Sequence, residues 1–247
     1  MKHIFVINLV RSKDRREHIL REIAKYRDDQ IAVEFFDAVD ASKKEHLKFK
    51  KHCIKFLTKC YFGQDLTDAE KGCFASHYCL WQKCVEMNEP IIVLEDDIDL
   101  ADSFLEGIER IYRSQYEYVR FRGTTTKKIW RMEEHFGITY LTLAGTQGYY
   151  LTPKAARKFL QKAYLWLWPV DLYTDKSYLN KVPNVIHLPY LINDEKYFSS
   201  TIGRRDSKIE VRKPKMGIRY VLKKIHKIRR RIYMAKDGRK LGIFNEQ

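Results

Sequence analysis

Three consecutive carboxylates follow a short apolar run and form the sharpest local feature of this sequence. The run is Ile91–Leu94, and the acids are Glu95, Asp96 and Asp97. The run predicts a buried strand, and ligands of open α/β sheets bind beyond the carboxyl ends of strands. Because three adjacent carboxylates repel one another, we expect a cation beside them. Mg²⁺ or Mn²⁺ suits such oxygen ligands and can also hold a diphosphate. A solvated acidic loop is the alternative interpretation.

A second polar group, formed by Asn8, Arg11 and Arg15, follows the apolar run His3–Leu9. A helix should begin here, and both helix N-termini and arginine side chains bind phosphate groups. Charged residues are also common in the first turn of a surface helix, so this pattern leaves both interpretations open.

The segment LTDAEKGCFASHYCLWQKCVEM predicts a helix. Thr67 and Glu70 have capping-box spacing, and apolar residues recur at helical intervals. Gly72 inside it costs about 1 kcal/mol relative to Ala, which indicates close approach by another group. His77 lies in the apolar stripe, where a lone histidine is more often a hydrogen-bonded core residue than a catalytic one.

Two later features could contact a sugar. Gly145, Thr146 and Gly148 form a loop before a short strand, although a plain turn is equally compatible. Asp171 follows the aromatic run Leu165–Pro169 and could deprotonate a hydroxyl group or simply cap a helix. There is no GxGxxG, P-loop, GxSxG or HExxH pattern.

The elements that must position these residues follow an α/β pattern. Strand, helix and strand over the first 40 residues predict parallel pairing. We leave residues 41–65 unassigned. The expected strands are His3–Leu9, Ile31–Val39, Ile91–Leu94, Tyr116–Phe121, Ile138–Leu143 and Tyr149–Leu151. The expected helices begin after Ser12, at Thr67, near residue 103 and at Thr152-Pro153, and another helix or a turn follows Asp171.

Composition indicates a globular chain. The 247 residues are 45% hydrophobic and 32% charged. No apolar run reaches the roughly 20 residues that span a bilayer, and the start reads as a strand rather than a signal peptide. We therefore expect a cytoplasmic protein whose five cysteines are free thiols.

The net charge of +15 is concentrated near the C-terminus. Residues 204–240 hold 16 Lys and Arg against three acids. We place a boundary near Phe198–Gly203, which separates a main domain, 1–203, from a basic amphipathic segment, 204–247. Such a helix can lie on an anionic membrane surface, or pack on the main domain or on a second copy. We expect no nucleic-acid binding, because the rest of the chain is nearly neutral. One helical face carries Ile218, Val221, Leu222, Ile225, Ile228 and Ile232.

Taken in order, these segments resemble glycosyltransferase family 25, the lipooligosaccharide galactosyl- and glucosyltransferases. The matching stretches are VINLVRSKDRR, FFDAVDA, LTDAEKGCFASHYCLW, IIVLEDDIDL and GTQGYYLTPKAARKFL followed by PVD. The resemblance implies a GT-A-like α/β fold, a nucleotide-binding mixed sheet flanked by helices, here with a basic helical C-terminal extension. It also implies transfer, with inversion, from a UDP-sugar, usually UDP-galactose, to a lipooligosaccharide or other glycolipid core.

The resemblance also suggests roles for individual residues. Glu95 and Asp97 would hold Mn²⁺ or Mg²⁺, while Asp171 is our first choice of base, with His77 as a further catalytic candidate. We considered His187 as a late metal ligand but do not rely on it. The expected donor-binding residues are Asn8, Arg11, Arg15, Asp40, Glu70, Gly72, Ser76, Asp96, Gly145, Thr146 and Gly148.

Two other functions fit parts of the sequence. One is a nucleic-acid-binding α/β protein with a basic tail, and the other is a UDP-sugar-binding module without catalysis. The linkage, the acceptor sugar and the choice of galactose over glucose depend on contacts that the sequence does not place. A homodimer is also compatible with it.

Overall fold

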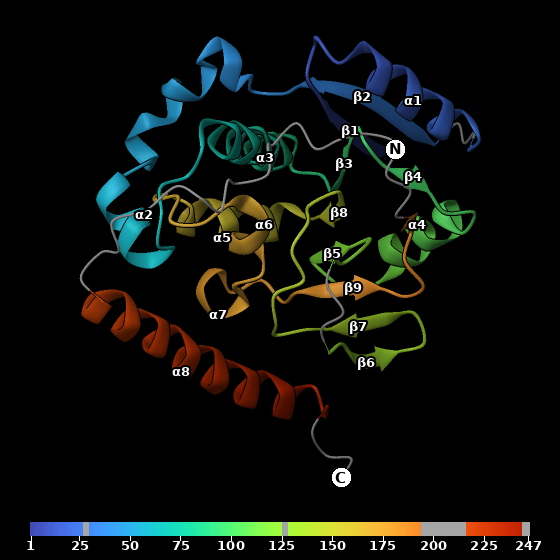
Figure 1. Cartoon of the computed structure of the whole chain (residues 1–247). Helices are drawn as coiled ribbons and strands as arrows, with labels where there is room; N and C mark the ends of the chain where they lie inside the picture. The colour runs from blue at the N-terminus through green and yellow to red at the C-terminus, as the bar shows by residue number, and fades with distance from the viewer. Residues whose placement is uncertain (27–29, 125–127, 194–215, 244–247) are drawn as a thin grey trace.

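The computed structural model describes residues 1–26, 30–124, 128–193 and 216–243. An eight-stranded mixed sheet in the order β2-β1-β3-β8-β5-β9-β7-β6 forms the centre of the molecule (Figure 1). Its strands are β1 Lys2–Asn8, β2 Ile31–Asp37, β3 Ile91–Glu95, β5 Tyr118–Arg120, β6 Trp130–Glu133, β7 Phe136–Ile138, β8 Gly148–Leu151 and β9 Val185–His187. A separate antiparallel pair joins β4 Asp99–Leu100 to β10 Ile192–Asn193.

Strand direction explains where the polar residues collect. β1 runs parallel to both β2 and β3, with Ile7 opposite Glu95. The carboxyl ends of these three strands therefore meet at one edge, beside the acids that follow β3. β8 then runs antiparallel between β3 and β5, which makes the sheet mixed.

Helices cover both faces of the sheet and bury two apolar clusters. α1 and α4 pack on one face, where Ile19 and Ile108 join β-strand residues such as Ile92. α3 and α5 pack on the other, where Trp81 and Phe159 are fully buried. The helices are α1 Lys13–Ala24, α2 Lys55–Tyr61, α3 Asp68–Met87, α4 Phe104–Arg113, α5 Pro153–Lys162, α6 Val170–Thr174, α7 Ser177–Asn180 and α8 Met216–Lys240.

The structure confirms the α/β class, with helices on both sides of a mixed sheet. The capping box of Thr67 and Glu70 is present, and the Thr152 side chain caps α5 at the backbone N–H of Ala155. Ser12 stands at the N-cap of α1, but its side chain makes no cap hydrogen bond. Residues 41–65, which we left unassigned, form the 3₁₀ helices η1 Ala41–Lys43 and η2 Glu45–His52 and then α2.

The predicted strand Ile138–Leu143 is wrong beyond its first residue, where β7 ends. Leu143 is buried as its apolar type suggests. Its backbone N–H, however, donates to the Asp175 side chain at 3.1 Å rather than to a neighbouring strand. Side-chain capping of the backbone therefore replaces the strand pairing that the apolar pattern predicted.

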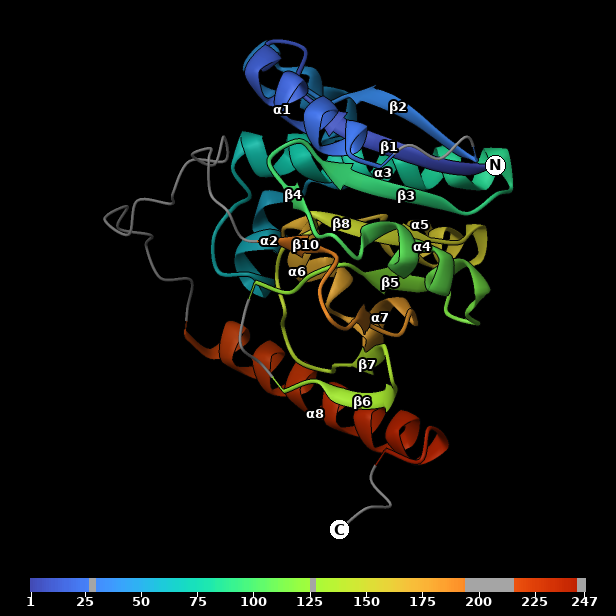
Figure 2. The same cartoon turned by 90° about the vertical axis from the view of Figure 1, so that its right-hand side faces the viewer.

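α8 lies at the opposite end of the molecule from α1 and packs against α2 and α7 (Figures 1 and 2). The domain boundary predicted near Phe198–Gly203 falls outside the described residues. Among the helices that the structure describes, none is long and apolar enough to cross a membrane.

Candidate active site

A hydrogen-bonded network of acidic and basic side chains lies at the carboxyl ends of β1 and β3. Asn8 Nδ2 donates to Asp96 Oδ2 at 2.6 Å, and Arg15 Nη1 donates to Asp96 Oδ1 at 3.0 Å. The same Arg15 nitrogen lies 3.1 Å from Asp97 Oδ2. Arg15 and Asp96 are both buried, and burial raises the pKa of Asp96 despite these hydrogen bonds. Because both oxygens of Asp96 are engaged, Glu95 and Asp97 are the acids left to meet a ligand.

Arg11 and Asp40 form a second wall of the same site. Arg11 Nη1 donates to Asp40 Oδ2 and, at 3.1 Å, to Ser42 Oγ. Asp40 also caps η1 by accepting from the backbone N–H of Ser42 at 2.8 Å. Burial raises the pKa of Asp40, but hydrogen bonds from Arg11 and Ser42 lower it overall, to about 2. This carboxylate is therefore charged and fixes Arg11 at the rim.

The two walls enclose a pocket of about 130 Å³ between β1, β3, α3 and the segment after β2. We call it the donor pocket, because the resemblance described above predicts donor binding for most of its polar residues. The structure brings together eight of the predicted site residues in its lining, and Asn8 holds Asp96 directly behind it. The eight are Arg11, Arg15, Asp40, Ser76, His77, Glu95, Asp96 and Asp97.

Glu95 is held by two side chains from different elements. Thr146 Oγ1 donates to its Oε1 at 2.7 Å, and His77 Nε2 lies 3.5 Å from the same oxygen. Desolvation raises the pKa of Glu95, but the neighbouring His77 ring and the hydrogen bond from Thr146 lower it overall. Glu95 is therefore an ionised, oriented carboxylate.

His77 itself is fixed by a buried relay that the sequence did not reveal. Its Nδ1 lies 3.0 Å from Tyr149 Oη, and Trp81 Nε1 donates to that hydroxyl oxygen at 3.0 Å. Since an indole N–H can only donate, the Tyr149 hydroxyl proton is available to His77 Nδ1, which leaves the Nε2 hydrogen facing Glu95. The only sequence signal was the helical spacing of His77 and Trp81.

The donor pocket fits a divalent cation. Burial and then the charge of Glu95 raise the pKa of Asp97 to about 6, as expected for neighbouring carboxylates that lack a full counter-charge. Asp97 Oδ1 is buried and has no hydrogen-bond partner within the described residues. A carboxylate oxygen without a hydrogen-bond partner, beside a second carboxylate that is ionised, matches the oxygen ligands of Mg²⁺ or Mn²⁺.

α3 reaches the pocket because two small residues allow close approach. A Cβ on Gly72 would lie 2.7 Å from the carbonyl oxygen of Val39. Ser76 Oγ accepts from the backbone N–H of Val39 at 2.9 Å, so it lines the pocket while holding the segment after β2. Glu70 and Gly72 do not line the pocket: Glu70 accepts from the Thr67 N–H at 2.8 Å, and Gly72 provides space.

The loop before β8 touches the site through one residue. Thr146 reaches Glu95, whereas Gly145 adopts a φ of +73° that favours glycine. Gly148 pairs with Leu94, and a Cβ there would meet Ile192 at 2.3 Å, so it serves the core. The Gly145 N–H lies 3.5 Å from Asp171 Oδ2.

Asp171 lies at the start of α6, next to the donor pocket rather than in its lining. Burial raises the pKa of the Cys73 thiol, and the nearby charges of Glu95 and Asp171 raise it further. Both carboxylates are therefore close enough to act on Cys73, a residue of the pocket lining. Burial also raises the pKa of Asp171, as suits a group that accepts a proton.

A buried pair that the sequence analysis missed fixes α6 and the loop. Arg120 Nη2 lies 3.3 Å from Asp175 Oδ1, and both side chains are almost completely buried. Arg120 also donates to the carbonyl oxygen of Ala144 at 3.0 Å and to Thr174 Oγ1 at 2.6 Å. The available signal was an arginine inside an apolar strand, which requires a buried partner.

Other candidate ligands lie elsewhere. His187 packs against Phe136 on the far strands and does not line the donor pocket. His18, Glu22 and Asp99 have ligand atoms within 4.8 Å of one another. Glu22 there accepts from the Leu100 N–H and from Lys25, so we assign this cluster to the attachment of α1 to β4.

Comparison with known proteins identifies the family. Residues 1–142 and 113–174 match the pattern of glycosyltransferase family 25 (LPS biosynthesis protein). A glycosyltransferase 25 family member from Aedes aegypti is 32% identical over 200 residues, which are 74% of this chain and 32% of that protein. The lipooligosaccharide biosynthesis protein lic2B of Haemophilus influenzae is 34% identical over 164 residues, 64% of this chain and 53% of its own.

Procollagen galactosyltransferase 1 of Danio rerio is 28% identical over 195 residues, which cover 73% of this chain and 32% of that protein. The chain thus spans between about a third and about half of the length of these relatives. Since the family pattern covers well over half of its residues and confirms the resemblance carried by its motifs, the chain belongs to glycosyltransferase family 25.

Proposed function

We propose that this chain is a glycosyltransferase that moves a hexose, galactose in our proposal, from a UDP-sugar to the core of a lipooligosaccharide. One observation carries the proposal. Glu95 and Asp97 stand at the end of β3, in a pocket shared with Arg11 and Arg15, and Asp97 keeps a buried oxygen without a partner among the described residues. Acids that can take a metal, next to an arginine at the rim, Arg11, that a phosphate can reach, suit a metal-bound nucleoside diphosphate.

The names of the relatives support the finer parts of this proposal. A lipooligosaccharide biosynthesis protein suggests the acceptor, and procollagen galactosyltransferases suggest galactose as the donor sugar. Family resemblance also suggests inversion at the anomeric carbon, which requires one base on the side opposite the departing UDP.

We assign separate roles to the polar side chains of the donor pocket. Glu95 and Asp97 would hold Mn²⁺ or Mg²⁺, which stabilises negative charge on the leaving diphosphate. Arg15 holds Asp96 and Asp97 in place, while Arg11 lies at the rim, where a phosphate can reach it. His77 keeps Glu95 oriented, so we assign it a positioning role.

Asp171 is our proposed base. It accepts from the Leu172 N–H at 2.7 Å through Oδ1, while Oδ2 makes, among the described residues, only the long 3.5 Å contact to the Gly145 N–H. Oδ2 therefore retains capacity to accept a proton from an acceptor hydroxyl.

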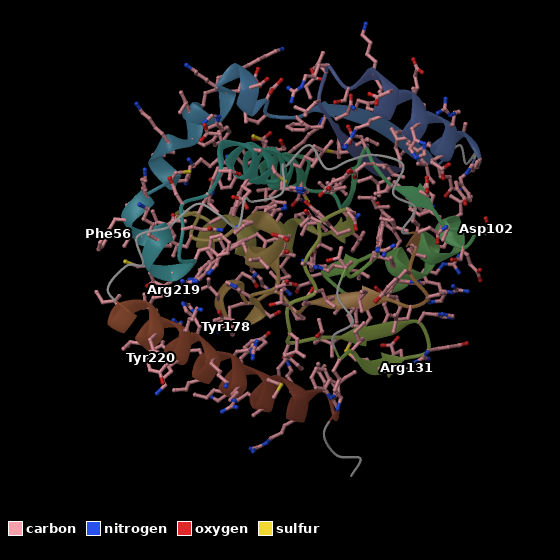
Figure 3. The ribbon with its side chains drawn as sticks, viewed as in Figure 1. Phe56, Asp102, Arg131, Tyr178, Arg219 and Tyr220 are labelled. Carbon is pink, nitrogen blue, oxygen red and sulfur yellow. The ribbon has the colours of Figure 1, made fainter. Side chains whose placement is uncertain are left out.

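A second observation favours action at a membrane surface. α8 docks through its polar face: Arg219 Nη2 donates to the Phe62 carbonyl at 3.0 Å, and Asp237 accepts from Tyr140 at 2.9 Å. Figure 3 shows Arg219 on the side of α8 facing the rest of the molecule and Tyr220 on the outward side. The predicted apolar face points outward, with five of its six members exposed: Ile218, Val221, Ile225, Ile228 and Ile232.

We propose that this outward face of α8 lies on an anionic lipid surface, the inner leaflet of the cytoplasmic membrane. α8 carries ten Lys and Arg and a single acid, Asp237, which bonds inward to Tyr140. Exposed isoleucines at spacings of three and four, flanked by basic side chains, match an interfacial helix. A glycolipid acceptor would then be presented beside the enzyme.

UDP release from a panel of UDP-hexoses, with and without Mn²⁺, tests the enzymatic proposal. We expect slow hydrolysis of one UDP-hexose, lost on chelation and lowered at least 100-fold in Asp97→Asn. Asp102→Asn removes an exposed carboxylate away from the donor pocket and should leave the rate unchanged (Figure 3). Binding of UDP without turnover on any acceptor would instead identify a donor-binding module without catalysis, and metal-independent release would refute the role of the acids.

A further inference from the structure

A second and larger pocket lies between α8 and the rest of the chain. Its volume is about 470 Å³, within the usual range for ligand sites. α6 contributes Leu172 and Lys176 to its wall, and α8 contributes Arg219 and His226. Figure 3 shows Arg219 and Tyr178, another lining residue, in this region between α8 and the core. We call it the basic pocket.

The charge of the basic pocket is strongly positive. Among the lining residues that the structure describes, Asp175 is the one acid. Its charge is matched by Arg120 at 3.3 Å and by the backbone N–H groups of Leu143 and Ala144. The donor pocket, in contrast, holds four acids and two arginines. The basic lining residues are Lys176, Arg219, Lys223, Lys227 and Arg230.

Several polar atoms in this lining have no hydrogen-bond or ion-pair partner among the residues that the structure describes. Lys176 Nζ lies over the Trp168 ring, 4.6 Å from its centre, but forms no ion pair with a described residue. His226 Nδ1 lies 3.0 Å from Tyr178 Oη, but its Nε2 is buried without a hydrogen-bond partner in the described part of the chain. The same holds for Arg219 Nε. Buried polar groups normally have partners, so these point to a ligand that supplies them.

Aromatic rings complete the lining. Trp168 and Tyr61 pack edge-on against His226, with ring centres 5.3 Å and 5.5 Å apart. An apolar C–H face of a pyranose ring can pack on such rings, while its charged substituent meets the lysines and arginines. The combination suits a sugar that carries an anionic group.

We infer that the basic pocket binds a phosphate or carboxylate group on the acceptor glycan and thereby places an acceptor hydroxyl near Asp171. The pocket and Asp171 share α6: Leu172 and Lys176 line the pocket, and Asp171 contacts the loop that carries Thr146 to Glu95. This inference rests on the proposed transferase function and names the chemistry of its acceptor.

Titration of the full chain with two sugar acids tests the inference. Hexose 6-phosphate, followed by ³¹P NMR, and glucuronate, followed by ligand-observed NMR, should both bind, and neutral glucose at least tenfold more weakly. The stronger of the two acids identifies the anionic group. Lys176→Gln and Lys227→Gln should each weaken binding about tenfold, as expected for loss of one charge-assisted contact. Lys224→Gln removes the same charge from the exposed side of α8 and should bind like the unmodified chain.

Equal binding of neutral and acidic sugars, or equal effects of the Lys176 and Lys224 substitutions, would overturn the inference. UDP release is measured on the same samples to separate the two proposals. Intact UDP release without anion binding refutes the basic pocket alone, whereas anion binding without any UDP release refutes the proposed transferase and leaves the pocket standing. Unchanged thermal unfolding of each variant confirms that a loss of binding is local.

Discussion

His77 and Tyr149 position Glu95, one of the two carboxylates that we propose as metal ligands. His77 contacts Glu95, a proposed metal ligand, so its loss should leave this carboxylate less well oriented. We therefore expect His77→Phe to weaken the apparent Mn²⁺ affinity about tenfold or more. Mn²⁺ titration of UDP release measures this. At saturating Mn²⁺ the rate should largely recover.

Tyr149→Phe provides the matched comparison, since it removes only the hydroxyl that contacts His77 Nδ1. It should produce a smaller shift in Mn²⁺ affinity of the same kind. A lost maximal rate with unchanged Mn²⁺ affinity in His77→Phe would instead mean that His77 acts on the reacting groups.

Lys176 gives the basic pocket a defined response to pH. Burial lowers the pKa of Lys176 to about 8; Asp175 and Asp171 oppose this shift, and Arg230 adds to it. Lys176 is therefore charged at neutral pH and loses its charge as the pH rises through 8. His226, the other titrating neighbour, has a pKa lowered by burial to about 4 and stays neutral. Glucuronate binding should thus be nearly constant below about pH 7 and weaken progressively as the pH rises through 8.

Lys176→Arg tests the assignment of this response, because arginine keeps its charge throughout that range. The variant should bind glucuronate with little dependence on pH. Persistence of the same decline above pH 8 would show that another group controls it.

Among the elements, α3 depends on Gly72 for its approach to the segment after β2. Gly72→Ala places a Cβ 2.7 Å from the carbonyl oxygen of Val39, a backbone atom that cannot rotate away. We expect loss of about 1–3 kcal/mol in the free energy of unfolding and weaker UDP binding, because the wall formed by Ser76 and Asp40 shifts. Chemical denaturation and UDP titration measure the two effects.

Gly217→Ala is the matched control, since α8 also holds this glycine and nothing lies within 4 Å of the added Cβ. Helix propensity alone should then make this variant equally or slightly more stable. If Gly72→Ala were as well tolerated as Gly217→Ala, close packing of α3 would not be what forms the donor pocket.

Local patterns explain why much of the fold could be predicted. Long apolar runs and caps located β1, β3, α3 and α5, since burial and capping act between residues close in sequence. β9, only three residues long, was missed because its pairing with β5 and β7 is decided by distant partners. The site residues follow the same rule: those marked by a local pattern were predicted, and those that depend on partners distant in sequence were not.

The acids after β3 were found because a strand end presents them together. In contrast, the relay from Trp81 through Tyr149 to His77 joins α3 to β8, and Arg120 meets Asp175 across 55 positions of sequence. The sequence also did not decide whether the α8 isoleucines point outward or toward the rest of the chain. An amphipathic pattern defines an apolar face but does not show what covers it.

Across the molecule, three surfaces follow one another from the donor pocket to α8. The donor pocket is acidic and lies beside the loop before β8, which contacts Asp171 of α6. The basic pocket is positive and is lined by α6 itself. The outward face of α8 lies beyond the basic pocket. This order would let a lipid-linked acceptor rest its apolar part at α8, its anionic sugar in the basic pocket and its hydroxyl near Asp171.

The outward face of α8 can be tested with vesicles. Ile225→Glu replaces an exposed apolar side chain by a negative one, so we expect at least tenfold weaker co-sedimentation with vesicles that contain anionic phospholipid. Binding by the unmodified chain should fall as salt rises and should be weak on zwitterionic vesicles. Leu20→Glu, an exposed position on α1 at the opposite end of the molecule, should bind vesicles normally. If Ile225→Glu leaves vesicle binding intact but converts a dimer to a monomer in sedimentation, this face joins two copies of the chain, and the proposed membrane contact is wrong.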